Sequence, residues 1–205
     1  MIFHKEKKLC LFMPPRTGST TARIFLAKNG WNLLKPEHGR PDQHLKKYPN
    51  IAEYKAHVFL RNPLTKFVSS ILFLKRVFIP NGTPQHFGYA LVEELIKANG
   101  LDCTVESLSY DQVVDLFPQF KEKFGVMFLA QVDWATMPGT EVLDFDNYEA
   151  ELRRISGAEG PIPNLNPTRN DYGKSVVTQK VIDFVRQEYA ADYALAKDRL
   201  GKEFA

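Results

Sequence analysis

Cysteine is scarce in this sequence, and its scarcity argues against two classes of small protein. The 205 residues include two cysteines, Cys10 and Cys103. Two thiols cannot form the dense disulfide framework of a small secreted domain, and no Cys/His group has the spacing of a zinc site. Since Cys10 lies inside a short apolar run, we expect both cysteines to be buried thiols in a reducing compartment.

Long apolar runs are also missing near the amino terminus. The charged first residues are followed by an apolar run at residues 9–13, which is too short for a signal-peptide core or a membrane span. We therefore expect a soluble, cytoplasmic protein that has no membrane partner.

A large charge of one sign is absent as well. The chain has 27 Lys and Arg residues against 24 Asp and Glu residues, a net charge of +3, which is too small to indicate a nucleic-acid-binding protein. With 44% apolar and 25% charged residues the composition is that of an ordinary globular chain. The length suits one domain with a full core, so we predict a single domain over residues 1–205.

Residues 9–25 predict a strand, a tight loop and the start of a helix. Two prolines stop the apolar run, then come Arg16, Gly18 and hydroxyl residues at 19–21, and apolar residues at helical spacing follow. The free N–H groups of a first helical turn favour an anion, Gly18 lets the backbone approach a ligand, and Arg16 adds forked donors. The stretch therefore predicts a phosphate-binding loop.

Two other interpretations of this loop lead to different functions. Ser19 or Thr20 can serve simply as the N-cap of the helix, since both residue types are common caps. A nucleotide triphosphatase needs the order G-x-x-x-x-G-K-[ST], but Met13 stands at the position of the first glycine and no lysine follows Gly18. The loop is therefore not a Walker A motif, which disfavours a P-loop-type kinase.

A second strand is predicted to end at a basic residue. Residues 56–60 form a short apolar run, Arg61 follows directly, and apolar residues at helical spacing begin at Phe67. Ligands of open α/β sheets bind at the carboxyl ends of the strands. Arg61 therefore marks a second strand-to-helix junction that is suited to an anion.

Both junctions resemble motifs of the sulfotransferases that use 3′-phosphoadenosine 5′-phosphosulfate (PAPS). The run Pro-Arg-Thr-Gly-Ser-Thr is similar to their 5′-phosphosulfate loop, P-[KR]-x-G-[ST]-[ST]. The run from Arg61 to Ser69 is similar to their 3′-phosphate motif, R-[DN]-P-x-x-[RK]-x-[VL]-S. The resemblance implies an α/β, P-loop-like three-layer fold, in which a short parallel sheet is flanked by helices.

The second half of the chain resembles the carbohydrate-type branch of that family, sulfotransferase family 2. Stretches similar to those of this branch occur in the same order in this chain, at residues 109–117, 130–134, 148–149, 165–168 and 189–193. The likeness therefore covers most of the chain. It departs from the family in having Arg16 where many members have lysine, and in being shorter than most members.

This resemblance implies a set of ligands and residue roles. The co-substrate would be PAPS, the product adenosine 3′,5′-bisphosphate, and the acceptor a carbohydrate or another small molecule, without a metal. Arg16 would be catalytic through its charge, because an arginine does not release a proton at neutral pH. The residues implied to bind the nucleotide are Arg16, Thr17, Gly18, Ser19, Thr20, Thr21, Arg61, Ser69 and Arg169.

The family places its catalytic base between the two phosphate motifs. We expect His38 to be this base, because a neutral imidazole is a good base near pH 7, and His44 and Glu37 are the alternatives. Within the long loop at 157–174, Arg169 is favoured to close over the nucleotide. A P-loop-type phosphotransferase and a non-catalytic nucleotide-binding protein are the alternative functions.

The remaining elements are predicted from periodicity and turn residues. Asp144 and Asp146 are better explained by helix capping than by a metal pair, and we expect Asp146 or Asn147 to cap the helix at 148–156. The apolar run at 126–130 fits a strand or a helix equally well. The other expectations are a loop with one short helical turn at 35–50, a loop at 77–85, a strand at 141–145, and helices at 22–29, 86–99, 109–117, 148–156 and 175–200.

Overall fold

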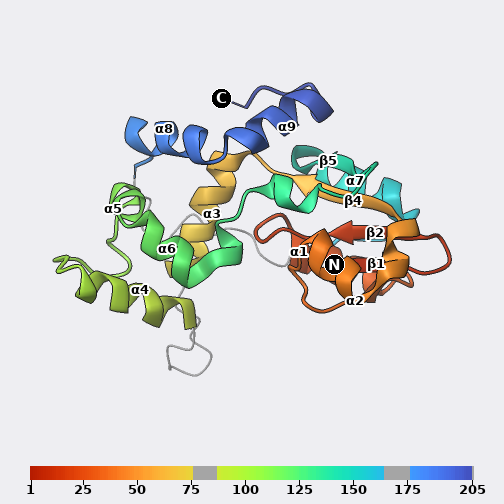
Figure 1. The fold of residues 1–205 in the computed structure, drawn as a ribbon, viewed down its shortest axis with the longest axis horizontal. Coiled ribbons are helices and arrows are strands. Elements are labelled where there is room, and N and C mark those ends of the chain that lie inside the picture. Colours follow the sequence, from red (N-terminus) through yellow and green to blue (C-terminus); the bar gives the residue numbers. More distant parts are fainter. Residues whose placement is uncertain (76–86, 164–175, 205) are drawn as a thin grey trace. The chain divides into compact units, whose positions relative to one another are not determined.

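An open sheet of five strands, partly parallel and flanked by helices, organises the part of the chain that the computed structural model describes: residues 1–75, 87–163 and 176–204 (Figure 1). The fold is therefore mixed α/β, as the sequence predicts. The strands are β1 (Ile2–His4), β2 (Leu9–Phe12), β3 (Asn32–Leu33), β4 (Lys55–Leu60) and β5 (Glu141–Asp144), and their order across the sheet is β3-β1-β2-β4-β5.

The parallel part of the sheet is β2, β4 and β5. Phe12 of β2 pairs with Val58 of β4, and Leu60 of β4 pairs with Asp144 of β5, so the carboxyl ends of these three strands lie at one edge. The strand β1 is antiparallel to both β2 and β3. The parallel sheet implied by the family likeness is thus extended here by an antiparallel hairpin.

Nine α-helices and four short 3₁₀ helices lie in the described residues. The 3₁₀ helices are η1 (Pro49–Glu53), η2 (Gly125–Met127), η3 (Gln131–Trp134) and η4 (Phe145–Asn147). The α-helices are α1 (Ser19–Ala27), α2 (Pro41–Lys47), α3 (Pro63–Lys75), α4 (Phe87–Ala98), α5 (Tyr110–Asp115), α6 (Phe117–Phe124), α7 (Tyr148–Ser156), α8 (Gln179–Glu188) and α9 (Ala190–Leu200).

The chain divides into two compact units. The first unit comprises Met1–Pro63, Leu129–Pro167 and Tyr189–Ala205, and it holds the whole sheet. The second unit comprises Leu64–Phe128 and Thr168–Glu188 and is helical in its described part. The prediction of one domain over residues 1–205 is not tested by this division.

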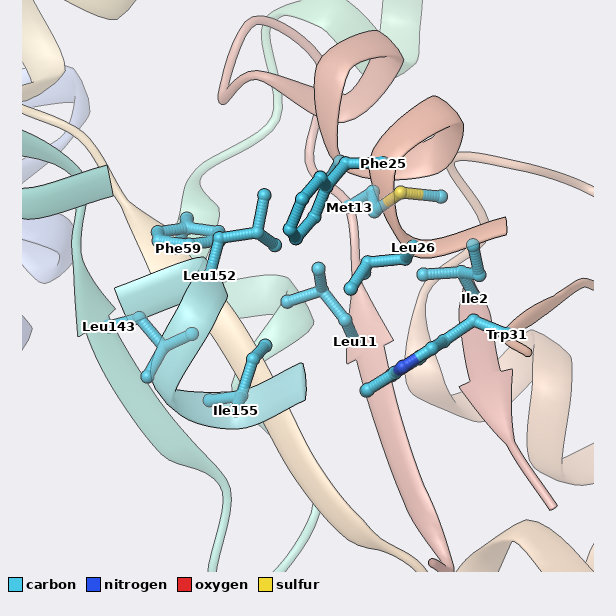
Figure 2. Close-up of a cluster of buried hydrophobic side chains, with 11 residues drawn as sticks. Ile2, Leu11, Met13, Phe25, Leu26, Trp31, Phe59, Leu143, Leu152 and Ile155 are labelled. Atoms are coloured by element: carbon cyan, nitrogen blue, oxygen red, sulfur yellow. The ribbon is translucent and has the colours of Figure 1, made fainter. Parts of the chain in front are cut away.

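The sheet of the first unit is buried on both faces. Leu11 and Phe59 belong to the cluster beneath α1 and α7, where they join Phe25, Leu26, Leu152 and Ile155 (Figure 2). Their neighbours along the strands, Phe12 and Val58, belong to a cluster with Ile51 and Trp134. Since side chains alternate between the faces of a strand, burial of both faces explains the unbroken apolar runs that predicted β2 and β4.

The second unit has an aromatic core. The ring of Phe67 in α3 lies 6.1 Å from that of Phe117, 6.0 Å from that of Phe128 and 5.8 Å from that of Phe184. The neighbouring Lys66 is buried, and its Nζ donates to the carbonyl of Met127 at 3.1 Å. Lys66 therefore serves the packing of this unit.

Several predicted elements are confirmed within one or two residues. They include β4 and β5, helix α4, and α5, whose Ser109 cap accepts a hydrogen bond from the backbone N–H of Gln112. Helix α1 begins at Ser19, three residues before the predicted start. The predicted loop at 77–85 lies outside the described residues.

Three predictions of secondary structure are wrong or incomplete, and two strands were not predicted. Residues 35–50 contain the whole of α2 and the start of η1, and the run at 126–130 forms neither strand nor α-helix. The strands β1 and β3 have three and two residues, which are too short to show a period in the sequence. The predicted helix at 175–200 is two helices, α8 and α9. The break at Tyr189 could not be predicted because the apolar stripe continues through it.

Candidate functional site

The loop from β2 to α1 turns through two left-handed residues. Arg16 has φ 66° and Gly18 has φ 75°. Only glycine adopts this conformation without strain, and a non-glycine residue there costs about 1–2 kcal/mol. Strain of this kind is frequent at ligand sites, so Arg16 is the first structural pointer to one.

The amino terminus of α1 has a glycine at its cap position. Gly18 is the N-cap residue and no side chain caps the helix, so the interpretation of Ser19 or Thr20 as a cap is wrong. The first helical hydrogen bond runs from the N–H of Ala22 to the Gly18 carbonyl at 2.9 Å. By helix geometry the N–H groups of residues 19–21 therefore have no partner inside the helix.

Thr17 uses its side chain inside the loop. It is 2% exposed, and its Oγ1 donates to the carbonyl of Pro14 at 2.7 Å. A contact from Thr17 to a phosphate would therefore come from its backbone N–H rather than from its hydroxyl.

Tyr148, at the start of α7, lies against the middle of this loop. Its hydroxyl donates to the Gly18 carbonyl at 2.8 Å. A Cβ atom at residue 18 would lie 2.7 Å from Cε2 of the Tyr148 ring. Gly18 is thus required by its conformation and by the close approach of this ring.

Arg61 follows β4 and reaches the loop that follows β2. Its Nη1 donates to the carbonyl of Arg16 at 2.9 Å, and its guanidinium lies 5.0 Å from the centre of the Phe145 ring. Burial lowers the pKa of Arg61, while the Asp146 carboxylate acts in the opposite direction. An arginine stays charged under both influences, so this edge of the sheet carries a half-buried cation.

The backbone of Arg61 is held by buried polar groups. Oε1 of Gln131 accepts from the Arg61 N–H at 2.9 Å, and Nε2 of Gln131 donates to the Arg61 carbonyl at 2.8 Å. The Asp192 carboxylate accepts from the backbone N–H and from Nε2 of Gln131, and from the N–H of Val132. Gln131 and Asp192 are both 0% exposed, so this network fixes the position of Arg61.

His38 lies in the segment between β3 and α2 and contacts the first residue after β2. Its Nδ1 lies 2.7 Å from the carbonyl oxygen of Met13, and its own carbonyl accepts from Nε1 of Trp134 at 3.3 Å. Since a carbonyl only accepts, Nδ1 carries the proton and the lone pair of the neutral ring is on Nε2. Met13 precedes Arg16 by three residues, a Cα distance of at most about 11 Å.

The two alternatives to His38 have other surroundings. His44 is 0% exposed, neither of its ring nitrogens has a hydrogen-bond partner among the described residues, and burial lowers its pKa to about 4. The carboxylate of Glu37 accepts from Nη1 of Arg23 at 2.9 Å. The surroundings of His44 thus make it a weak base, and Glu37 is engaged in an ion pair with Arg23.

Two of the predicted nucleotide contacts, Ser69 and Arg169, lie outside the described part of the first unit, which holds the loop. Ser69 is buried in α3 and belongs to the second unit, so its predicted pairing with Arg61 stays a prediction. Arg169 lies outside the described residues, as do most of the residues of the loop predicted at 157–174.

Asp144 and Asp146 form ion pairs at the end of β5. Nζ of Lys202 lies 2.6 Å from Oδ2 of Asp144 and 3.0 Å from Oδ2 of Asp146. Asp144 also accepts from the N–H of Asp146 and so caps η4. Asn147 stands at the N-cap of α7, but its side chain makes no capping hydrogen bond. Of the two residues predicted to cap the helix at 148–156, Asn147 thus occupies the N-cap position of α7 and Asp146 does not.

The described part of the chain contains neither a metal-binding group nor a membrane-spanning helix. Residues 1–75, 87–163 and 176–204 hold no group of three or more His, Cys, Asp or Glu side chains arranged to bind a metal ion. No described helix is both long enough and apolar enough to cross a membrane.

Sequence reasoning gave no role to Tyr148, Gln131 or Asp192. The family likeness includes the stretches around all three, yet no spacing in the chain connects Tyr148 with Gly18 or Gln131 with Arg61. Their contacts join residues that are 130 and 70 positions apart. A buried glutamine and a buried aspartate are unusual enough to be noticed once burial is known.

Comparisons with protein-family models, with curated proteins and with solved structures find no match for this chain.

Proposed function

We propose that this chain is a PAPS-dependent sulfotransferase, of the carbohydrate type, that transfers a sulfuryl group to an acceptor hydroxyl. The observation that carries the proposal is the 2.9 Å hydrogen bond from Arg61 to the Arg16 carbonyl. It joins Arg61, whose motif resembles the 3′-phosphate motif of the family, to the loop that resembles its 5′-phosphosulfate loop, 45 residues away along the chain. A nucleotide that carries phosphates at both positions needs these two motifs side by side.

The loop suits a dianionic phosphate group. The first turn of α1 has no acidic residue, and no side chain caps it. An anion there would accept hydrogen bonds from the first-turn N–H groups and face the positive end of the helix dipole. In this proposal β2, the loop and α1 are the strand, phosphate loop and helix of a P-loop-like fold.

The proposed mechanism divides the work between the loop and His38. PAPS would supply the sulfuryl group, which is bonded through oxygen to its 5′-phosphate. Nε2 of His38 takes the proton of the acceptor hydroxyl while the new O–S bond forms. Arg16 and the N–H groups of α1 stabilise the charge that gathers on the 5′-phosphate while the old S–O bond breaks.

The products balance this step. They are a sulfate ester, adenosine 3′,5′-bisphosphate and a protonated His38, which returns its proton to water. A positioned base contributes about 10²–10⁴-fold to such a transfer, and removal of one anion-stabilising donor costs about 3–4 kcal/mol. Arg16 acts through charge alone, in place of the lysine of many family members.

Calorimetric titration with adenosine 3′,5′-bisphosphate tests the proposal. We expect the wild type to bind the bisphosphate in preference to AMP and ATP, and Arg61→Ala to bind it about 100-fold more weakly because a half-buried cation is lost. Arg154→Ala is the matched control, since Arg154 pairs with Glu141 and Glu151 away from the loop.

Other results would favour the alternative functions. A preference for ATP would favour a P-loop-type phosphotransferase. Bisphosphate binding without turnover on any acceptor would favour a non-catalytic nucleotide-binding protein.

A further inference from the structure

We propose that Tyr148 is a positioning residue of the phosphate loop, which together with Arg61 holds two loop carbonyls so that the backbone N–H groups face the 5′-phosphate. The inference rests on the proposed function and deepens it. Two hydrogen bonds carry it: Tyr148 donates to the Gly18 carbonyl at 2.8 Å, and Arg61 donates to the Arg16 carbonyl at 2.9 Å.

The planar peptide bond links these carbonyls to the N–H groups that would bind the ligand. In a trans peptide the C=O of one residue and the N–H of the next point in opposite directions. A donor that fixes the Arg16 carbonyl therefore fixes the N–H of Thr17, and a donor that fixes the Gly18 carbonyl fixes the N–H of Ser19. Both N–H groups are then turned away from the donors.

The conformation of the loop makes such support necessary. Arg16 and Gly18 have φ values of 66° and 75°, so a left-handed residue lies on each side of Thr17. Turns of this kind can bring successive N–H groups into a concave anion site. Because Arg16 is strained there, contacts from outside the loop have to hold its peptide in place.

The Tyr148 hydroxyl is itself held in place. Its ring lies 4.6 Å from the Phe59 ring and 5.4 Å from the Phe145 ring, and the Arg61 guanidinium lies over the same Phe145. Burial raises the pKa of Tyr148, so the phenol stays protonated and able to donate. Phe145 thus supports both donors that hold the loop.

The expected consequence is specific to one end of the nucleotide. Tyr148→Phe removes the hydroxyl but keeps the ring that packs against Gly18, Phe59 and Phe145. Only the 5′-phosphate contacts the N–H groups of residues 17 and 19, so the loss should depend on the presence of that phosphate. A purely structural role would weaken every ligand alike.

The experiment compares two ligands on two variants by calorimetric titration. We expect Tyr148→Phe to bind adenosine 3′,5′-bisphosphate about 5- to 10-fold more weakly than the wild type, as for the loss of one hydrogen bond. Its affinity for adenosine 3′-monophosphate, which lacks the 5′ group, should be unchanged. The control Tyr54→Phe removes a hydroxyl next to the other end of β4 and should leave both affinities unchanged.

Three results would overturn the inference and separate it from the proposed function. Equal weakening of both ligands would make Tyr148 a structural residue, and unchanged binding of the bisphosphate would show that the loop does not need it. In both cases the sulfotransferase proposal stands. A wild type that binds neither ligand would overturn the proposed function and this inference with it.

Discussion

Two strand-to-helix junctions of the first unit lie at the same edge of the sheet but differ in their helix caps and in their charges. At the junction from β5 to α7, Asp144 caps η4, and Lys202 pairs with Asp144 and Asp146. The first turn of α7 carries Glu149 and Glu151, which suit the positive end of the helix dipole. This junction balances its charges with its own side chains.

The junction from β2 to α1 has none of these features. Gly18 stands at the N-cap without a side-chain bond, and the first turn of α1 carries no acidic residue. Arg61 donates to the Arg16 carbonyl, and its guanidinium therefore adds a positive charge beside this junction. The junction therefore presents backbone donors and positive charge, and an external anion would play the part that Glu149 plays at the other junction.

The comparison teaches that a strand-to-helix junction is informative when its own residues leave the helix dipole unbalanced. The fold alone does not mark the proposed anion site, because both junctions lead from a strand to a helix at the same edge of the sheet. The difference lies in the side chains, and single substitutions can therefore exchange or abolish it.

The largest expected effect concerns His38, the proposed base, which contacts the first junction through the Met13 carbonyl. His38→Gln should lower turnover about 100- to 10,000-fold and leave the affinity for adenosine 3′,5′-bisphosphate nearly unchanged, because the imidazole serves the acceptor. Steady-state kinetics with PAPS and calorimetry on the same preparation measure the two quantities.

His44→Leu is the matched control for that histidine. His44 is buried and its ring nitrogens have no hydrogen-bond partner among the described residues, so an apolar replacement should leave turnover within a few-fold. A loss of turnover that is larger in His44→Leu than in His38→Gln would reverse the assignment of the base.

An intermediate effect is expected when the first junction is made to resemble the second. Ser19→Glu puts a carboxylate into the first turn of α1. It should weaken binding of the bisphosphate at least about tenfold through repulsion, and stabilise the fold by about 0.5 kcal/mol through the helix dipole. Calorimetry and urea denaturation measure the two changes.

The reciprocal change in α7 controls for charge alone. Glu149→Gln removes one negative charge from the second junction and should not alter binding of the bisphosphate. If Ser19→Glu bound the bisphosphate as tightly as the wild type, the amino terminus of α1 would not be the phosphate site.

The smallest effect is expected at the second junction. Lys202→Ala removes the ion pairs to Asp144 and Asp146 and should destabilise the fold by about 0.5–1 kcal/mol, as is usual for pairs near the surface. Binding of the bisphosphate should not change. Weaker binding in this variant would mean that the two junctions are not independent.

Elements buried on both faces or marked by caps were the ones that could be predicted. The apolar runs of β2 and β4 are continuous because both faces of these strands are covered, and Ser109 marks the start of α5 with its capping hydrogen bond. The break between α8 and α9 gave no signal, because Val185, Tyr189 and Ala196 keep the apolar stripe buried on both sides of it.

For the candidate site, the order of strand, loop and helix could be predicted from the sequence, but the contacts between distant residues could not. The local sequence predicted that a proline-ended strand, a glycine turn and a run of hydroxyls would form a strand, loop and helix, because these preferences act between near neighbours. It also indicated Arg61 at the end of a second strand, because a short apolar run and a following helix are local signals.

Only the tertiary structure decided which groups meet around that loop. The contact of His38 with Met13 joins residues 25 apart, that of Arg61 with Arg16 joins residues 45 apart, and that of Tyr148 with Gly18 joins residues 130 apart. The contacts of Arg61 and Tyr148 follow from the pairing of β2 with β4 and of β4 with β5, which sets three strand ends side by side. No spacing in the chain encodes this pairing, because many distant residues contribute to the packing that fixes it.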